Sequence, residues 1–461
     1  RAAAEGDVVA PPGLLAAFCD TGGLSFLVGL GGLYEATLVS RWCPSGRAPG
    51  VRALVDVGLR HRSSEVREDV VAALGEEAVL LATSHAELAA ECVAGLSGVA
   101  LADDDKSVRM RTVGELGRVA SMSNGGLAEQ CIAALAGALQ EPGRAADEPP
   151  PGEQPRPEGR VHGIGSRGRR AAQAQVQAAW RHGSMEFRAA TELSLLGLDA
   201  AFAAPCADAL AAWGLHSRRP RVRVVAADGL GHIAKAAAQR AEAGVASACV
   251  AALREHGLRD PHQGVRDSTA IALGRVAVAS PARHAELARL CIAALSEDVR
   301  ASLDRSTATV SVLGGIAASC AGDRAELALS SLFAVSEVGF LSNLSHTRQR
   351  MARILGSVAA KARVSEGRVG PVTTHCIVAL KDAARRDGHR AVRWAAAKAL
   401  DESGVEWRRR SRRVRRVLRQ EKVDESARRQ KRCRPWRVGG RRAVFASAVH
   451  RGLVLGRLVR G

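Results

Sequence analysis

The sequence is poor in aromatic residues. Phenylalanine, tryptophan and tyrosine together make up 3% of its 461 residues, with a single tyrosine, whereas apolar residues as a whole reach 47%. A core of that size must then be built mainly from alanine, leucine and valine. Such residues suit closely packed helices better than sheets, which draw on aromatic and β-branched side chains. We therefore expect an all-α protein, arranged as two or three compact domains or as one extended array.

Short motifs for metal and nucleotide binding are also missing. The ten cysteines are widely spaced and form no Cys-x-x-Cys pair, which argues against a zinc ribbon or finger. There is no phosphate-binding Gly-x4-Gly-Lys-Ser/Thr loop and no Gly-x-Ser-x-Gly elbow. The segment GIGSRG at 163–168 matches Gly-x-Gly-x-x-Gly, but it follows a proline-rich stretch instead of a strand. We interpret it as linker glycine and expect no bound cofactor.

Long apolar runs are absent as well. The most apolar early stretch, at 24–39, is short, rich in glycine and contains Glu35, which argues against a membrane span. The chain begins with Arg1, so a removed or missing N-terminal segment stays open. We expect a soluble protein of the cytoplasm or nucleus, without a membrane partner.

Positive charge is concentrated at one end of the chain. The formal net charge is +19, and residues 405–461 hold 20 lysines and arginines against 4 acidic residues, so the rest is nearly neutral. This Arg-rich tail could contact the phosphates of nucleic acid or another polyanion, could be read by the acidic groove of an import receptor, or could simply be solvated and disordered. The candidate contacts are Arg408, Arg409, Arg410, Arg412, Arg413, Arg415 and Arg416.

The body of the chain repeats itself. The segments at 64–78, 106–120, 220–234 and 263–277 share a Val-Arg and Leu-Gly pattern, and weaker copies follow. The leucine of this pattern recurs at Leu74, Leu116, Leu230, Leu273, Leu313, Leu355 and Leu400. The first step is 42 residues, and those from Leu230 onward are 43, 40, 42 and 45. Such a period is typical of a solenoid of helical hairpins.

A second segment recurs between these copies, as HAELARLCIAAL at 284–295 shows. Its histidine and cysteine, His284 and Cys291, lie about 10 Å apart along a helix axis, too far to share one metal ion. The recurrence favours a structural reading over a catalytic or metal site. Six cysteines occupy one equivalent place in this segment: Cys92, Cys131, Cys206, Cys249, Cys291 and Cys376. We expect them to be buried thiols that behave as small apolar residues, which favours a reducing compartment.

Three Asp-x5-Arg pairs precede or begin the first segment. They are Asp103 with Arg109, Asp260 with Arg266, and Asp387 with Arg393. Together with the Val-Arg and Leu-Gly-x-Val/Ile-Ala pattern, they make residues 51–404 resemble the HEAT-repeat (armadillo-like) family. The resemblance implies an α-solenoid of about seven to eight hairpins, in which these residues form a structural ladder between neighbouring repeats. Some copies depart from the pattern, since Ser306 replaces the arginine and Ser217 and Ser342 replace the aspartate.

We divide the chain accordingly. The expected parts are a divergent N-terminal cap at 1–50, repeats at 51–140, a Pro/Gly-rich segment at 141–170, repeats at 171–404 and the Arg-rich tail at 405–461. The segment at 141–170 could be a long loop within one superhelix or a hinge between two arrays.

The resemblance implies a non-enzymatic scaffold or adaptor that binds protein partners along a concave solenoid face. A nucleic-acid-associated protein, with the tail on phosphates, is the first alternative. A metal-dependent enzyme is the second, because deoxyhypusine hydroxylases are HEAT-like and build a di-iron site from His-Glu dipeptides. The sequence contains no such dipeptide. We therefore expect no catalytic, cofactor-binding or metal-binding residues.

Overall fold

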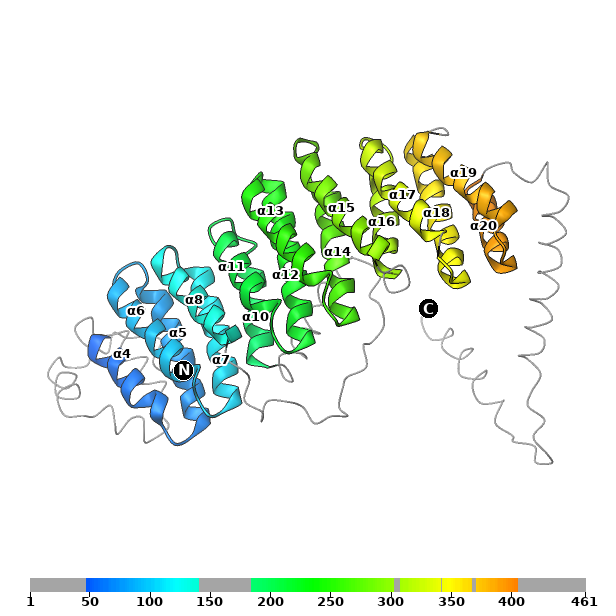
Figure 1. The fold of residues 1–461 in the computed structure, drawn as a ribbon. Helices are drawn as coiled ribbons and strands as arrows, with labels where there is room; N and C mark the ends of the chain where they lie inside the picture. Colours follow the sequence, from blue (N-terminus) through cyan, green and yellow to red (C-terminus); the bar gives the residue numbers. More distant parts are fainter. Residues whose placement is uncertain (1–46, 141–183, 302–306, 341, 367–369, 405–461) are drawn as a thin grey trace, which may run out of the picture.

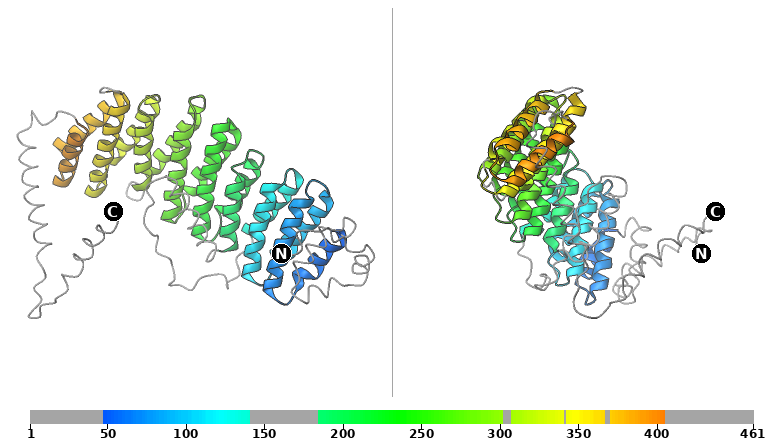
Figure 2. Two further views of the ribbon diagram at one scale, coloured as in Figure 1. Left: turned by 180° about the vertical axis from the view of Figure 1, so that it is seen from behind. Right: turned by 90° about the vertical axis from the view of Figure 1, so that its right-hand side faces the viewer.

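The computed structural model describes residues 47–140, 184–301, 307–340, 342–366 and 370–404. Every regular element in these ranges is helical (Figure 1). Most of the expected cap, the segment at 141–170 and the whole Arg-rich tail lie outside them. The α-helices stack side by side along one axis, as expected for a solenoid (Figures 1 and 2).

The helices form two layers. The first layer, which we call the glycine layer, contains the Leu-Gly segments: α5 (Ser64–Leu81), α7 (Lys106–Met122), α10 (Met185–Leu196), α12 (Pro220–Arg240), α14 (Gln263–Ala279), α16 (Thr307–Cys320), α18 (Ser345–Glu366) and α20 (Arg390–Glu402). The second layer, the cysteine layer, contains α4 (Arg47–Asp56), α6 (Ala86–Gly95), α8 (Gly126–Gln140), α11 (Ala203–Ala209), α13 (Ala243–Ala252), α15 (Ala285–Ala301), α17 (Ala325–Gly339) and α19 (Pro371–Arg386). The described residues thus form eight hairpins, which confirms the predicted all-α solenoid.

Short turns complete the hairpins. The 3-10 turns Gly58–Arg60 and Ala282–His284 precede α5 and α15, and three cysteine-layer helices end in a π-helical turn: Leu96–Ala100, Leu210–Gly214 and Leu253–Gly257. Side chains cap several glycine-layer helices. Asp105 accepts a hydrogen bond from the amide of Ser107 at 2.7 Å at the start of α7, and His262 and His389 accept from main-chain amides in the same way before α14 and α20. Such caps satisfy amides that have no partner inside the helix.

The core lies between the two layers. The repeated leucines of the glycine layer and the repeated cysteines of the cysteine layer are all buried and belong to one continuous apolar cluster. Phe202 is the one buried aromatic residue in the described ranges. The core therefore relies on small and branched aliphatic side chains, which allows helices to approach closely.

The array continues across residues 141–183. Helix α10 packs directly against both α7 and α8, so the helices on either side of this segment are in contact. The divergent copy that the sequence places after the linker therefore stacks like the other repeats.

Neighbouring helices of the glycine layer approach each other closely along more of their length than those of the cysteine layer. Closer packing of this kind is expected of the layer that lines the concave face of a curved solenoid.

Candidate functional site

Three aspartates before glycine-layer helices bind arginines of the preceding repeat. Arg67 on α5 donates Nε and Nη2 to the carboxylate of Asp103, at 2.7 and 2.8 Å. The equivalent pairs are Arg223 with Asp260, at 2.6 and 3.0 Å, and Arg348 with Asp387, at 2.8 and 3.2 Å. The side chains of all three pairs are at most 15% exposed. Bidentate pairs of this kind are geometrically specific, so each one fixes the position of one repeat on the next.

The electrostatics of these pairs agree with their geometry. The hydrogen bond to Asp103 raises the pKa of Arg67. Burial by itself would raise the pKa of Asp387, but hydrogen bonds from Arg348 and from the amide of His389 outweigh it and lower that pKa. Both partners of the Arg348–Asp387 pair are therefore held in the charged state.

The other member of each Asp-x5-Arg pair makes a different contact. Arg109, Arg266 and Arg393 each donate Nη1 to the main-chain carbonyl of the aspartate six residues earlier, at 2.7 Å in all three copies. These arginines close a turn within their own repeat, whereas the aspartate carboxylate binds the repeat before it. We infer a structural role for all six residues.

The arginines that bind the carboxylates were not identified from the sequence. Arg67, Arg223 and Arg348 stand 36, 37 and 39 residues before their aspartates. Each occupies the arginine position of the Asp-x5-Arg pattern in its own repeat, but the aspartate position six residues earlier holds another residue: His61, Ser217 or Ser342. Arg223 and Arg348 still close that turn, by donating to the carbonyls of Ser217 and Ser342 at 2.9 and 2.7 Å. The turn needs only a carbonyl oxygen, which any residue supplies. Serine at these positions therefore removes the inter-repeat pair and leaves the turn.

In the two copies where serine replaces the aspartate, the arginine of the preceding repeat is replaced too. Ser217 follows the repeat of α10, in which Glu186 stands at the arginine position. Glu186 instead pairs with Arg219 at 3.1 Å, so the ion pair between α10 and α12 has reversed polarity. Ser342 likewise follows the copy in which Ser306 replaces the arginine.

The Leu-Gly glycines accept side chains from the next helix of the same layer. A Cβ atom at each glycine would overlap one particular neighbour: Ala272 for Gly231, Val312 for Gly274, Ile354 for Gly314 and Ala399 for Gly356. Each neighbour stands immediately before the repeated leucine of its own helix. The glycine therefore recurs because it permits this close approach.

Glutamates occupy the first two of these positions. Glu115 lies over Gly75, and Glu192 lies over Gly117. Glu115 is bound on both sides, by Arg111 Nε at 3.1 Å and by Arg118 Nε at 2.7 Å. Among the described residues, Glu192 pairs only with Arg188, whose Nε is 3.9 Å from Oε1, beyond hydrogen-bonding distance. Burial raises the pKa of Glu192 to about 7, although the charge of Arg188 partly opposes the shift.

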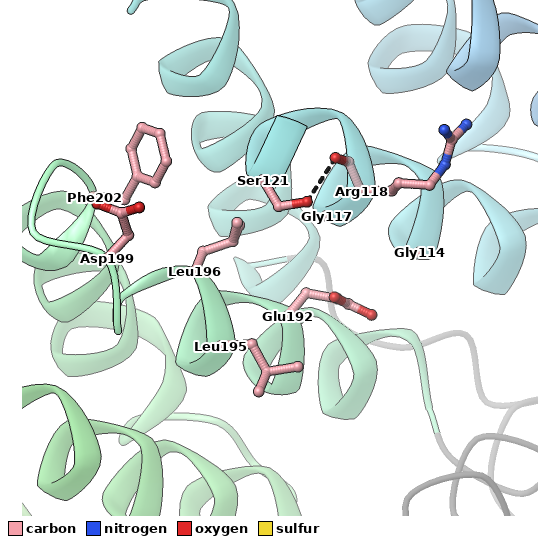
Figure 3. A pocket seen from close by; sticks show the side chains of 9 residues that line it. All are labelled: Gly114, Gly117, Arg118, Ser121, Glu192, Leu195, Leu196, Asp199 and Phe202. Atoms are coloured by element: carbon pink, nitrogen blue, oxygen red, sulfur yellow. Dashed lines mark hydrogen bonds between the residues drawn. The ribbon is translucent and has the colours of Figure 1, made fainter. Parts of the chain in front are cut away.

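A hollow of about 450 Å³ opens beside Glu192, between α7 and α10. Figure 3 shows Leu195 and Leu196 of α10 close to the Glu192 side chain, with Asp199 and Phe202 farther along the hollow. The guanidinium of Arg118 binds Glu115 instead of Glu192, with its Nε donating at 2.7 Å. The hollow thus combines apolar walls with two carboxylates.

One exposed position of the glycine layer changes its chemistry from repeat to repeat. It is the residue after the glycine, or after its equivalent, and reads Glu76, Arg118, Leu195, His232, Arg275, Gly315, Ser357 and Glu402 from α5 to α20. Leu195 is 56% exposed, and two further apolar side chains of this layer, Met122 and Ile271, are 66% and 42% exposed. The fold does not prescribe the residue type here, in contrast to the repeated leucine, glycine and aspartate.

The cysteines are placed as the sequence predicts. Cys92, Cys131, Cys206, Cys249, Cys291 and Cys376 are buried in their helices and carry free thiols. Burial raises the pKa of the first five to about 12. Such thiols remain protonated and unreactive at neutral pH.

The other candidates from the sequence gain no site in the described ranges. His284 ends a 3-10 turn and Cys291 is buried in α15. No group of three or more histidine, cysteine, aspartate or glutamate side chains in this part of the chain could hold a metal ion. No described helix is long and apolar enough to cross a bilayer. The tail arginines, from Arg408 to Arg416, lie outside the described residues.

Comparisons with known proteins find similarity among solved structures. No family model matches the chain, and no curated protein matches it. An engineered protein is 15% identical over 85% of this chain and 98% of its own, with a TM-score of 0.32. Kap121p is 15% identical over 90% of this chain and 45% of its own, with a TM-score of 0.39. A chain of the Pds5–Scc1 complex is 12% identical over 82% of this chain and 54% of its own, with a TM-score of 0.38.

The chain thus spans about half the length of the Kap121p and Pds5–Scc1 structures. Its own architecture determines the fold. The described residues form eight stacked hairpins in two helix layers, with a period of about 42 residues. Aspartate–arginine pairs connect neighbouring repeats, as expected for HEAT repeats. The chain has the fold of a HEAT-repeat α-solenoid.

Proposed function

We propose that this protein is a non-enzymatic scaffold or adaptor that binds protein partners along the exposed face of the glycine layer. The observation that carries the proposal is the contrast between two sets of positions on the same helices. The leucine, glycine and ladder positions repeat because packing requires them. The exposed position after the glycine is not constrained by packing, and its residue type differs on each of the first five helices: Glu76, Arg118, Leu195, His232 and Arg275.

The chemistry of this face suits a protein surface. Exposed apolar side chains such as Met122 and Ile271 lie among charged ones, which is the composition of ordinary protein–protein interfaces. The charge also changes along the face: equivalent positions hold Asp69 on α5 and Arg350 on α18. A partner that follows the solenoid would therefore bind in one direction only.

The test compares two doubly substituted variants of the full chain in affinity capture from cell extract. Met122→Asp with Ile271→Asp places charge on exposed apolar positions of the glycine layer. Leu290→Asp with Val378→Asp does the same on the cysteine layer, where these residues are 49% and 61% exposed. We expect the first variant to lose the proteins that the unmodified chain retains at high salt, and the second to keep them. Equal recovery by both variants would contradict the proposal.

A second proposal concerns the Arg-rich tail, residues 405–461. Its 20 lysines and arginines against 4 acidic residues favour contact with phosphates or another polyanion. Binding of this kind weakens steeply with salt, whereas a protein interface on the solenoid responds less. Recovery of nucleic acid at low salt that disappears at high salt would support this role, and its absence at low salt would count against it.

A further inference from the structure

The hollow between α7 and α10 contains a carboxylate that no cation of the described residues hydrogen-bonds. The described residues place only Arg188 near Glu192, with its Nε 3.9 Å from the carboxylate. Arg111 and Arg118 both bind Glu115 and do not supply a second partner. The equivalent glutamate of the preceding repeat is thus fully neutralised, whereas Glu192 is not.

The walls of the hollow determine what could neutralise it. Leu195, Leu196 and Phe202 are apolar, and Asp199 adds a second carboxylate farther along (Figure 3). Arg118 also lines the hollow, but its guanidinium is bound to Glu115, so the two carboxylates disfavour an anion. A purely apolar group would leave Glu192 without a hydrogen-bonded partner. A lysine side chain combines an apolar four-carbon stem with an ammonium group that donates up to three hydrogen bonds. It therefore matches both the walls and the carboxylate.

We propose that this hollow receives a lysine side chain of a protein partner, with Glu192 as its counter-ion and the two leucines around its stem. The inference rests on the proposed function, because it names the chemistry that the partner presents at this point of the glycine-layer face. The source is a separate protein and not the chain's own tail, whose basic residues are 18 arginines and 2 lysines.

Binding in the hollow has a definite pH dependence. The groups around Glu192 are Arg188 on its own helix, Glu115 and Arg118 on α7, and Asp199 after α10. Burial raises the pKa of Glu192 to about 7, so at pH 6 most Glu192 carboxyl groups are protonated while the hollow is empty. A lysine ammonium binds the ionised form. The affinity therefore rises between pH 6 and pH 8.

The test uses peptides selected from a random twelve-residue display library against the full chain. The best peptide is then measured by calorimetry at pH 8 against the unmodified chain, Glu192→Gln and the control Glu129→Gln, an exposed glutamate on the cysteine-layer helix α8. We expect lysine in the selected peptides and a loss of about tenfold or more for Glu192→Gln. We expect no change for Glu129→Gln. Replacement of the lysine by norleucine, which keeps the stem and removes the charge, should cost the same factor and nothing further in Glu192→Gln.

Two results would overturn the inference alone: a norleucine peptide that binds as tightly as the lysine peptide, or binding that is lost in Met122→Asp with Ile271→Asp but unchanged in Glu192→Gln. A peptide of residues 406–422 that competes in a Glu192-dependent way would reassign the site to the chain's own tail. Binding that neither variant affects would contradict the proposed function itself. Melting temperatures of all variants show that each one is folded.

Discussion

Glycine and glutamate show, at the level of single residues, which positions the solenoid needs. Gly314 and Gly315 are neighbours on α16, yet their surroundings differ completely. A Cβ at Gly314 would overlap Ile354 of α18, whereas one at Gly315 meets nothing within 4 Å. The sequence predicts the repeated Leu-Gly pair, but it does not reveal which neighbour the glycine contacts, because that depends on the helix spacing.

This difference gives a matched pair of substitutions. We expect Gly314→Ala to lower the free energy of unfolding by about 1–3 kcal/mol, because the added methyl group must displace Ile354. We expect Gly315→Ala to raise it by about 0.5–1 kcal/mol, because alanine favours an exposed helix. Urea denaturation of both variants measures the two effects. Equal effects of the two substitutions would contradict the close approach of α16 and α18.

Glu192 predicts a pH-dependent stability. Because burial raises its pKa to about 7 in the folded chain, the folded state holds this proton more tightly than the unfolded state does. The resulting stabilisation is complete below the unfolded pKa, roughly pH 4, and is lost as the pH rises through 7. Glutamine cannot ionise, so Glu192→Gln should be more stable than the unmodified chain at pH 8, by about 1–3 kcal/mol, and similar to it near pH 4.

Denaturant titrations at the two pH values measure this difference. Glu76→Gln is the control, since Glu76 is exposed on α5, and should change the stability by less than about 0.5 kcal/mol at either pH. A Glu192→Gln variant that is less stable than the unmodified chain at pH 8 would show that Arg188 compensates the carboxylate fully.

At the level of helices and turns, the aspartate–arginine pairs set the register between repeats. The sequence identified the Asp-x5-Arg spacing, which corresponds to the turn within one repeat. The resemblance implied a ladder between repeats, but the sequence did not identify which arginine each aspartate binds, because a single aspartate can bind arginines from either side. The matched loss of both partners, as with Ser217 and Glu186, is visible in the sequence only after the structure shows which positions meet.

Breaking one of these pairs should cost more than breaking an exposed pair. We expect Asp260→Asn to lower the free energy of unfolding by about 2–4 kcal/mol, because Arg223 would keep its charge in a largely buried place. The control is Glu297→Gln, which removes the exposed pair with Arg254, and should cost less than about 1 kcal/mol. Thermal denaturation measures both variants. Similar losses in the two would indicate that the ladder contributes no more than a surface ion pair.

At the level of the whole molecule, the sequence predicted the all-α solenoid, its period and its number of hairpins, because these follow from patterns that repeat along the chain. The candidate site depends instead on the surroundings of Glu192, which no other described copy repeats. Glu192 lies in a divergent copy, and its surroundings arise where α10 packs on α7 across residues 141–183. A method that looks for repetition cannot find a residue whose role comes from departing from it.

The central claim is that partners bind the glycine-layer face. The measurement that tests it most directly is hydrogen exchange of the full chain, alone and with a captured protein partner, resolved by helix. The account predicts slower exchange on binding in successive glycine-layer helices, α7, α10, α12 and α14 among them, and little change in α13, α15 and α17. Protection confined to the cysteine layer, or to residues 405–461, would contradict it.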